Sequence, residues 1–516
     1  MLMSRETIRQ DKAFDALTDA ILQRDQPRTT DLFFGMVARE GRSVGEALSV
    51  VTAAEAPFVQ VPNHINVRDG QLVLVNNDHT ILGLRTSTAL MPYLPESHRL
   101  LPLLQSVWYI PAGLDIWNQL LGKYPGRYAT MKGLNVPPPE HGPVVWNQDQ
   151  APIREGGTIE ERLNAHTLAT MGGEVQRSYG MFLDLAADEE ARPKLRDQLL
   201  FLGLIDMQDT IVGRKARNTG HKALRARAIA DLAEFVGWER AHGVFYTGVP
   251  DMAVGPLYYS TYDAVCVHLA ANFADTGNKL RETNETPLTA AEVESFVDLL
   301  MTGEPQAVWD QLTAHLKAGK SLRSLGDTIQ IGAAELILRN TVPRAFTDGQ
   351  HPFDYCNAAN YWMRTSDSPY QPRVVYLMAH FVNDAARANK WQTPVMDQEL
   401  AGFDASGRAP EALLRELDDA ILAFDVPRST AIAHAYLQSG ADRKPYQAAV
   451  AVTACKFQDD PHNQKITHSS FEEYENNTTH LRDRLLMASV RQLAGWPKMP
   501  GERDCYARFE KDWIRQ

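Results

Sequence analysis

Apolar residues recur every three or four positions through most of this chain, the spacing that makes one face of an α-helix hydrophobic. The segment from Ala307 to Leu316 is one example, and Gly319 follows it. Proline residues stand near the expected helix starts, and glycine residues stand at the expected ends, where the backbone needs a positive φ. The pattern predicts an all-α fold.

One short stretch departs from the helical spacing. Within residues 58–76, apolar and polar residues alternate in Ile65–Arg68 and again in Gln71–Val75, with Asp69-Gly70 between the two runs. Alternation is typical of a β-strand, and Asp-Gly is typical of a tight hairpin turn. We therefore expect a small β-hairpin near residues 58–76. Its open end would bring together four polar residues: Asn63, His64, Asp78 and His79.

A repeated segment is the strongest internal signal. LTDAILQRDQPRTT at 17–30 returns as LDDAILAFDVPRST at 417–430, with eight identical residues between Asp19 and Thr30. A looser copy starts at residue 296 and has a helix that closes at Gly319, and another starts at residue 197 and closes at Gly220. The repetition predicts four copies of one structural unit.

Each copy is expected to contain three helices, and stacked copies would bury a continuous core in a curved or closed array. Residues 1–135 would form the first repeat with the hairpin, and 158–516 would form the further repeats. The proline-rich stretch 136–157 would be a linker or an ordered loop. We expect these parts to make one compact structural unit.

Composition and charge narrow the functional class. The 516 residues are 44% hydrophobic and carry a net charge of -12, which argues against a broad nucleic-acid surface. We interpret the basic residues between Arg214 and Arg227 as a solvated helix face. Neither a signal-peptide core nor a run of about 18 apolar residues is present, so we expect a cytoplasmic protein without a membrane partner. Four widely spaced cysteines suggest neither a zinc ribbon nor a disulfide framework.

Histidines return at comparable places in the copies. His64, His351 and His462 each follow the third helix of a copy. If the copies are equivalent, a closed array brings these positions toward its centre. Neutral imidazoles are ligands for iron, copper and zinc, so the histidines form a candidate metal site. The alternative is that they cap helices or bond locally, since His351-Pro352 and Asp460-Pro461 resemble helix starts.

Three segments carry a resemblance to known proteins: NHINVRDGQLVLVNNDHT, TGHKALRARAIADLAEFVGWERAH and HPFDYCNAANYW. In them the chain resembles a loosely defined group of bacterial helical proteins that contain histidines, some of them joined to Rieske iron–sulfur domains. Questin-oxidase-like proteins are more loosely similar. The resemblance implies redox chemistry and singles out His64, His79, His221, His351 and Asn357. Members tend to carry a histidine where this chain has Arg240, which leaves the role of that segment open.

Two functional hypotheses follow. The first is a metal-dependent oxidoreductase that acts on a small, partly apolar metabolite, with non-haem iron as the first choice of metal and zinc or copper as alternatives. Its metal ligands would be His64, His79, His221, His351 and His462. Its catalytic residues would be Asp78, Asn63 and Asn357, and an electron-donor protein could be required. The second hypothesis is a non-catalytic helical-repeat protein that binds a ligand or serves as a scaffold.

Overall fold

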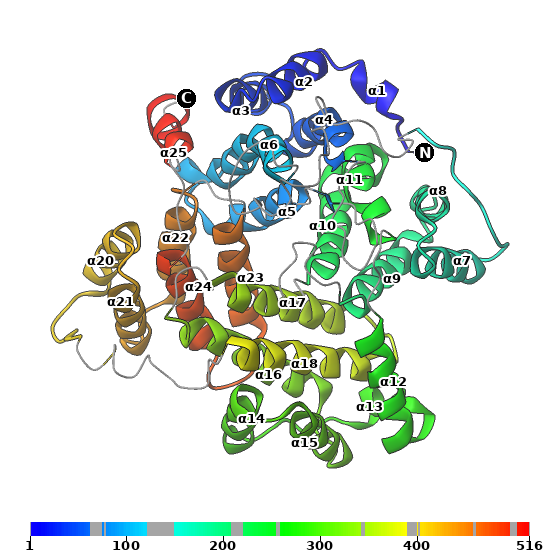
Figure 1. Ribbon diagram of the computed structural model, residues 1–516. Coiled ribbons are helices and arrows are strands. Elements are labelled where there is room, and N and C mark those ends of the chain that lie inside the picture. The colour runs from blue at the N-terminus through cyan, green and yellow to red at the C-terminus, as the bar shows by residue number, and fades with distance from the viewer. Residues whose placement is uncertain are drawn as a thin grey trace.

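The described part of the chain is almost entirely helical (Figure 1). The computed structural model describes residues 2–61, 75–76, 79–120, 149–207, 220–253, 259–341, 346–389, 400, 403–457, 461–495 and 503–514. Buried residues from helices throughout these ranges belong to one contiguous hydrophobic core. The predicted all-α class is therefore confirmed.

Four inner helices surround the centre of the molecule. They are α5 (His79–Leu90), α10 (His221–Val236), α17 (Phe346–Thr365) and α23 (His462–Asn476). Helix α10 packs against α5 and α17, and α23 packs against the same two helices, so the four close a ring (Figure 1). The first and last parts of the chain thus meet directly, where α5 contacts α23.

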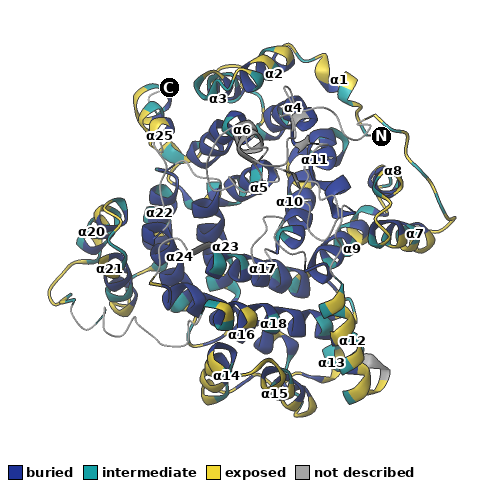
Figure 2. Ribbon diagram, in the orientation of Figure 1, coloured by how far each residue is buried: buried dark blue, intermediate teal, exposed yellow. Residues whose placement is uncertain are grey.

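A second set of helices packs on the outside of the inner four. These helices are α4 (Val44–Glu55), α6 (Leu101–Leu120), α9 (Arg192–Ile205), α11 (His242–Met252), α16 (Leu322–Leu338), α18 (Gln371–Asn389), α22 (Arg443–Ala454) and α24 (Asp483–Gly495). Most of their described residues are buried, because they have neighbours on both sides (Figure 2).

Amphipathic helices form the periphery, and their outer faces are exposed (Figure 2). The peripheral helices are α1 (Arg5–Arg9), α2 (Phe14–Leu22), α3 (Gln26–Phe34), α7 (Ile159–Met171), α8 (Val175–Ala186), α12 (Ser260–Asn272), α13 (Leu280–Thr283), α14 (Ala290–Thr302), α15 (Pro305–Lys317), α20 (Pro410–Leu422), α21 (Val426–Gln438) and α25 (Asp504–Arg508). Short helical turns connect several of them: η1 (Gly35–Arg39), η2 (Ala56–Phe58), η3 (Met91–Tyr93), η4 (Glu96–His98), η6 (Trp238–Arg240), η7 (Ala274–Gly277) and η9 (Phe509–Trp513).

The expected helix start and stop signals are present. Capping boxes begin α4 at Ser43, α7 at Thr158 and α14 at Thr289. In each box, the side-chain oxygen of the cap residue accepts a hydrogen bond from a backbone N–H, and the glutamate three residues later accepts one from the backbone N–H of the cap residue. At the helix ends, Gly319 and Gly440 have φ values of +78° and +74°. The predicted role of glycine at these ends is confirmed.

The repeated segments 17–30 and 417–430 form the same turn. Arg24 and Phe424 have φ values of 60° and 58°, although neither is glycine. The next residue in each, Asp25 or Asp425, accepts a hydrogen bond from a backbone N–H and begins the following helix. The sequence match therefore corresponds to a matched local structure.

Only the base of the predicted hairpin falls among the described residues. Strand β1 (Gln60–Val61) pairs antiparallel with β2 (Val75–Asn76), with Val61 opposite Val75. A two-residue turn at Asp69-Gly70 would instead place residue 61 opposite residue 78. The hairpin itself, in residues 62–74, lies outside the described residues and stays a prediction.

Among the described residues, no helix combines the length and the apolar character needed to cross a membrane.

Candidate functional site

Four imidazoles face one another at the centre of the inner helices. Their ring centres are 5.3 Å apart between His79 and His221, 5.1 Å between His221 and His351, 5.9 Å between His351 and His462, and 5.3 Å between His462 and His79. Each helix contributes one member, so the contacts close on themselves. We call these four residues the histidine ring.

Local structure fixes where each ring member stands. His79, His221 and His462 are the first residues of α5, α10 and α23, whereas His351 lies inside α17. Gly220 precedes His221 with a φ of +64°, and a side chain there would come within 2.9 Å of the Tyr355 Cβ atom. Glycine therefore allows α10 to begin close against α17.

A hydrogen bond ties two of the ring helices together at the same level. Gln350, the residue before His351, donates from Nε2 to the backbone carbonyl of His462 at 2.8 Å. Gln492 of α24 donates in turn to Gln350 Oε1 at 2.9 Å. The starts of α23 and the first turns of α17 are thus held from both sides.

The surroundings of His351 favour its neutral form. Burial lowers the pKa of His351 well below its usual value, and His221, Lys465 and the remaining ring members act in the same direction. The Nε2 atoms of all four rings are shielded from solvent, and His351 Nε2 has no hydrogen-bond partner among the described residues. A neutral imidazole with a shielded nitrogen is the form that binds a metal.

The imidazoles do not yet converge on a common point. Within the described part of the chain, no group of three or more His, Cys, Asp or Glu side chains stands close enough to hold a metal ion. The ring supplies the right chemical donors, and coordination would require them to reorient.

A second polar layer lies below the ring. Six residues after its ring histidine, each inner helix carries another buried polar side chain: Arg85, Arg227, Asn357 and His468. We call these four residues the second layer. Arg85 Nη1 lies 3.2 Å from His468 Nδ1, and Arg227 Nη1 donates to Asn357 Oδ1 at 2.8 Å. In every inner helix the second-layer residue follows the ring histidine by six positions, and both layers join neighbouring helices. The four helices therefore run in the same direction, and the two layers lie about 9 Å apart along them.

Arg227 is the most connected member of the second layer. It makes a bidentate pair with Glu472 of α23, at 2.8 and 2.6 Å, and lies 3.9 Å above the Tyr361 ring. Burial alone would raise the pKa of Glu472, but the Arg227 guanidinium outweighs it and holds that pKa well below its usual range. This carboxylate is therefore charged and compensated.

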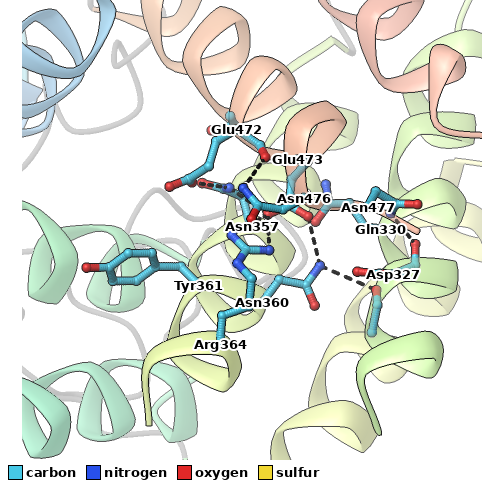
Figure 3. Close-up of polar contacts among 12 residues, drawn as sticks. Asp327, Gln330, Asn357, Asn360, Tyr361, Arg364, Glu472, Glu473, Asn476 and Asn477 are labelled. Carbon is cyan, nitrogen blue, oxygen red and sulfur yellow. Dashed lines mark hydrogen bonds and ion pairs between the residues drawn. The ribbon is translucent and has the colours of Figure 1, made fainter. Parts of the chain in front are cut away.

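The network continues through the neighbouring carboxylate (Figure 3). Glu473 is fully buried and accepts from Asn357 at 2.9 Å, from Asn360 at 3.0 Å and from Arg364 at 3.2 Å. Asn357 also donates to Glu472 at 2.7 Å. The side-chain amide of Asn357 thus takes part in the second layer, where it joins α17 to α23. A direct catalytic role for Asn357 stays a prediction.

The structure overturns the interpretation of the basic stretch as a solvated helix face. Lys222, Arg225 and Arg227 are 0%, 3% and 3% exposed. Lys222 donates to Asp206 at 2.5 Å, and Arg225 forms an ion pair with Asp251. These partners come from parts of the chain outside α10, so the spacing of residues along α10 could not reveal them. The basic residues from 214 to 217 lie outside the described residues.

The structure brings together four of the five histidines proposed as ligands, namely the histidine ring. The fifth, His64, lies outside the described residues, as do Asn63 and Asp78. Sequence comparison equated His64 with His351 and His462, but His79 is the residue that joins them in the ring. Because His64 lies outside the described residues, its equivalence to His351 and His462 stays a prediction.

A narrow pocket adjoins the ring at His79. About 220 Å³ of unfilled space is lined by His79, Gln105, Tyr109 and Gln464, among others, although no water-sized sphere fits inside it. The Gln105 Oε1 atom is buried there without a hydrogen-bond partner among the described residues. Tyr109 contributes an aromatic side chain to this lining.

Sequence reasoning missed the charged residues below the ring. Lys465, Ser469 and Glu472 follow His462 in α23 at steps of three and four, which places them along one side of the helix. Polar residues at helical spacing within a helix that is otherwise buried were the available signal.

Comparisons with known proteins identify no relative. No protein-family model, no curated protein and no solved structure gives a significant match to this chain. The functional argument therefore rests on the site.

Proposed function

We propose that this protein is a metal-dependent oxidoreductase whose metal ion is held by His79, His221, His351 and His462. The observation that carries the proposal is the closed ring of four imidazoles, one from each inner helix. Buried histidines are commonly isolated and hydrogen-bonded, whereas a ring of four concentrates the donors that first-row metals prefer.

The spacing of the ring supports this proposal. Two imidazoles bound to one ion at about 2.0–2.1 Å have ring centres about 5 Å apart. The observed separations, from 5.1 to 5.9 Å, are slightly larger. A modest inward movement of the side chains would bring the donors to coordinating distance.

Iron is the metal that best suits an oxidoreductase with these ligands. Four imidazoles on a six-coordinate ion leave two positions, where an ion could activate oxygen or polarise a substrate carbonyl. The chain's own contribution is to keep the imidazoles neutral, as at His351, and to hold the four helices in register through the second layer. Zinc and copper are the alternatives.

We also infer that the ring arises from a fourfold repeat of helices. Two peripheral helices, a helix of the second set, an inner helix and another helix of the second set follow one another in α2–α6, α7–α11, α14–α18 and α20–α24. On this basis the second repeat starts at α7, and residue 197, taken as its start from the sequence, lies inside α9. Equivalent inner helices explain why each brings one histidine and one buried polar residue to the centre.

A small, partly apolar metabolite remains the proposed substrate. Beside His79, Tyr109 would supply an aromatic wall and Gln105 an unused acceptor, but no water-sized sphere fits the pocket, so its lining side chains would have to move to admit such a molecule. An electron-donor protein is proposed from the resemblance to proteins joined to Rieske domains.

One observation favours the alternative of a non-catalytic binding protein or scaffold. Among the described residues no three ligands already stand in coordinating positions. In a binding protein or scaffold, the four histidines would only pack against one another at the centre of the fold, and the protein would hold no metal ion.

Metal analysis by inductively coupled plasma mass spectrometry tests the proposal. The chain should be purified without a metal-binding tag and loaded anaerobically with Fe(II). We expect about one ion per chain, lost in His221→Ala and His351→Ala while circular dichroism stays unchanged. The matched control is His315→Ala, a buried histidine of α15 outside the ring, which should keep the ion. No ion in the loaded wild-type chain would overturn the proposal.

A further inference from the structure

A buried lysine with incomplete compensation lies one turn below the ring. Lys465 follows His462 by three residues in α23 and is 5% exposed. Its ammonium group can donate three hydrogen bonds, yet its Nζ atom makes none with the described residues. The nearest carboxylate oxygen is Asp354 Oδ2, at 3.9 Å.

Asp354 compensates this charge only weakly. It accepts hydrogen bonds from Ser469 at 2.9 Å and from Gln350 at 3.2 Å, so its oxygens already have donors. Burial raises its pKa, which lowers its readiness to carry a negative charge. A buried cation in this position favours a further anion.

Lys465 lies on the side of α23 that carries its ring histidine. It follows His462 by three residues, about one helical turn, so the two residues share a face of this helix. Three inner helices begin at their ring histidines, and the N-terminal end of a helix carries a partial positive charge. The positive charge of Lys465 and the partial positive charges of these helix ends therefore add up near the histidine ring.

We propose that the histidine ring and Lys465 form a binding site for the carboxylate group of a small organic ligand. In the metal-free chain one carboxylate oxygen would accept from Lys465 Nζ, and the other would accept from His351 Nε2, which has no partner among the described residues. In that form a monoanion matches one incompletely paired lysine, whereas a phosphate dianion would bring a second negative charge that Lys465 does not meet. The inference rests on the proposed function for its location and names the substrate class of that site.

Isothermal titration calorimetry on the full chain, with sodium propionate as the probe, tests this inference. The titration should be run on metal-free and on Fe(II)-loaded protein, with sodium phosphate in parallel. Lys465→Met removes the charge at similar length, and Lys465→Arg keeps it. Lys320→Met is the matched control, because Lys320 is also buried but is paired with Glu292 at 2.7 Å.

We expect propionate binding that weakens by about tenfold or more in K465M, which loses a hydrogen bond to a charged group, and that is retained in K465R and K320M. The metal content, measured separately, should be the same in all four proteins. Propionate binding by a wild-type chain that takes up no metal would overturn the metal proposal and leave the carboxylate site standing.

Three results would overturn the inference: no propionate binding to either form of the wild-type chain, equal binding by K465M, or tighter binding of phosphate than of propionate. If K465M fails to fold, a crystal structure of the wild-type chain with 3-bromopropionate decides the question. The bromine signal should lie beside the histidine ring with the carboxylate on Lys465, and a ligand elsewhere would contradict the assignment.

Discussion

The imidazole centres of His221 and His351 lie 5.1 Å apart, at an interplanar angle of 81°. Six positions further along the same two helices, Arg227 donates a hydrogen bond to Asn357 at 2.8 Å. Two contacts at equal spacing keep α10 and α17 side by side in the same direction. The second contact is buried and charged, so it sets the register in which the first one occurs.

On the proposed function, His79 is the metal ligand that α5 contributes, in place of His64. We expect His79→Ala to lower the metal content well below that of the wild-type chain, whereas His64→Ala should keep the metal, because the ring is closed by His79. Mass spectrometry of the loaded proteins measures both. The opposite pattern, with metal lost in H64A alone, would return the hairpin histidine to the site.

The second layer should be a major source of stability. Arg227→Met leaves Glu472 buried without its partner, and we expect a loss of about 3–5 kcal/mol in the free energy of unfolding, measured by urea denaturation. A double variant, R227M/E472M, should recover part of the loss, since no charge is then stranded. Arg177→Met, which breaks an exposed pair with Glu155, is the control and should leave the urea midpoint unchanged. Equal midpoints for R227M and the wild-type chain would contradict this role.

Stability should fall with rising pH because of Glu55. Burial raises the pKa of this carboxyl to about 8, although a hydrogen bond with Thr80 opposes the shift. Between pH 4.5 and 8 the folded chain therefore holds a proton that the unfolded chain releases, so the free energy of unfolding decreases as pH rises through this window.

Glu55→Gln removes this dependence. We expect its stability relative to the wild-type chain to increase by on the order of 1.4 kcal/mol per pH unit across the window, in urea titrations at several pH values. The exposed Glu304→Gln is the control and should show no such rise. Parallel pH profiles for E55Q and the wild-type chain would show that Glu55 is charged in the fold.

The turn shared by the repeated segments stores backbone strain. Phe424 has a φ of 58°, which glycine adopts freely and other residues adopt at a cost. We expect Phe424→Gly to be more stable than Phe424→Ala by about 1 kcal/mol, since comparing the two truncations cancels the loss of the aromatic ring. The same comparison at Arg24 should give the same sign. Thermal melts of the two pairs provide the measurement, and equal stability within each pair would argue against strain.

Much of the fold could be predicted from the sequence because it is encoded locally. Helical periodicity, capping residues and the glycines at 319 and 440 act within a few positions of the chain, and the structure confirms them. The eight identical residues between Asp19 and Thr30 and their counterparts in 417–430 marked a turn that proved the same in both segments.

The candidate site was predicted only in part, because it depends on contacts between distant helices. Recurrence of histidine pointed to His351 and His462, which do meet, but it grouped them with His64, and the contact of His79 with His462 depends on how α5 packs against α23. The buried charges of α10 resembled a solvated face, since their partners, Asp206, Asp251 and Glu472, are supplied by other helices. Lys465 gave no local sign of its incomplete pairing.

The order in which the ring members occur along the chain has a consequence for biosynthesis. The ribosome makes His79, His221 and His351 before His462, and α23 must then pack between α17 and α5. A nascent chain that lacks α23 has a gap on one side of its centre and no Lys465. If the ring holds an ion as proposed, the complete set of ligands exists only after α23 has been made and has packed.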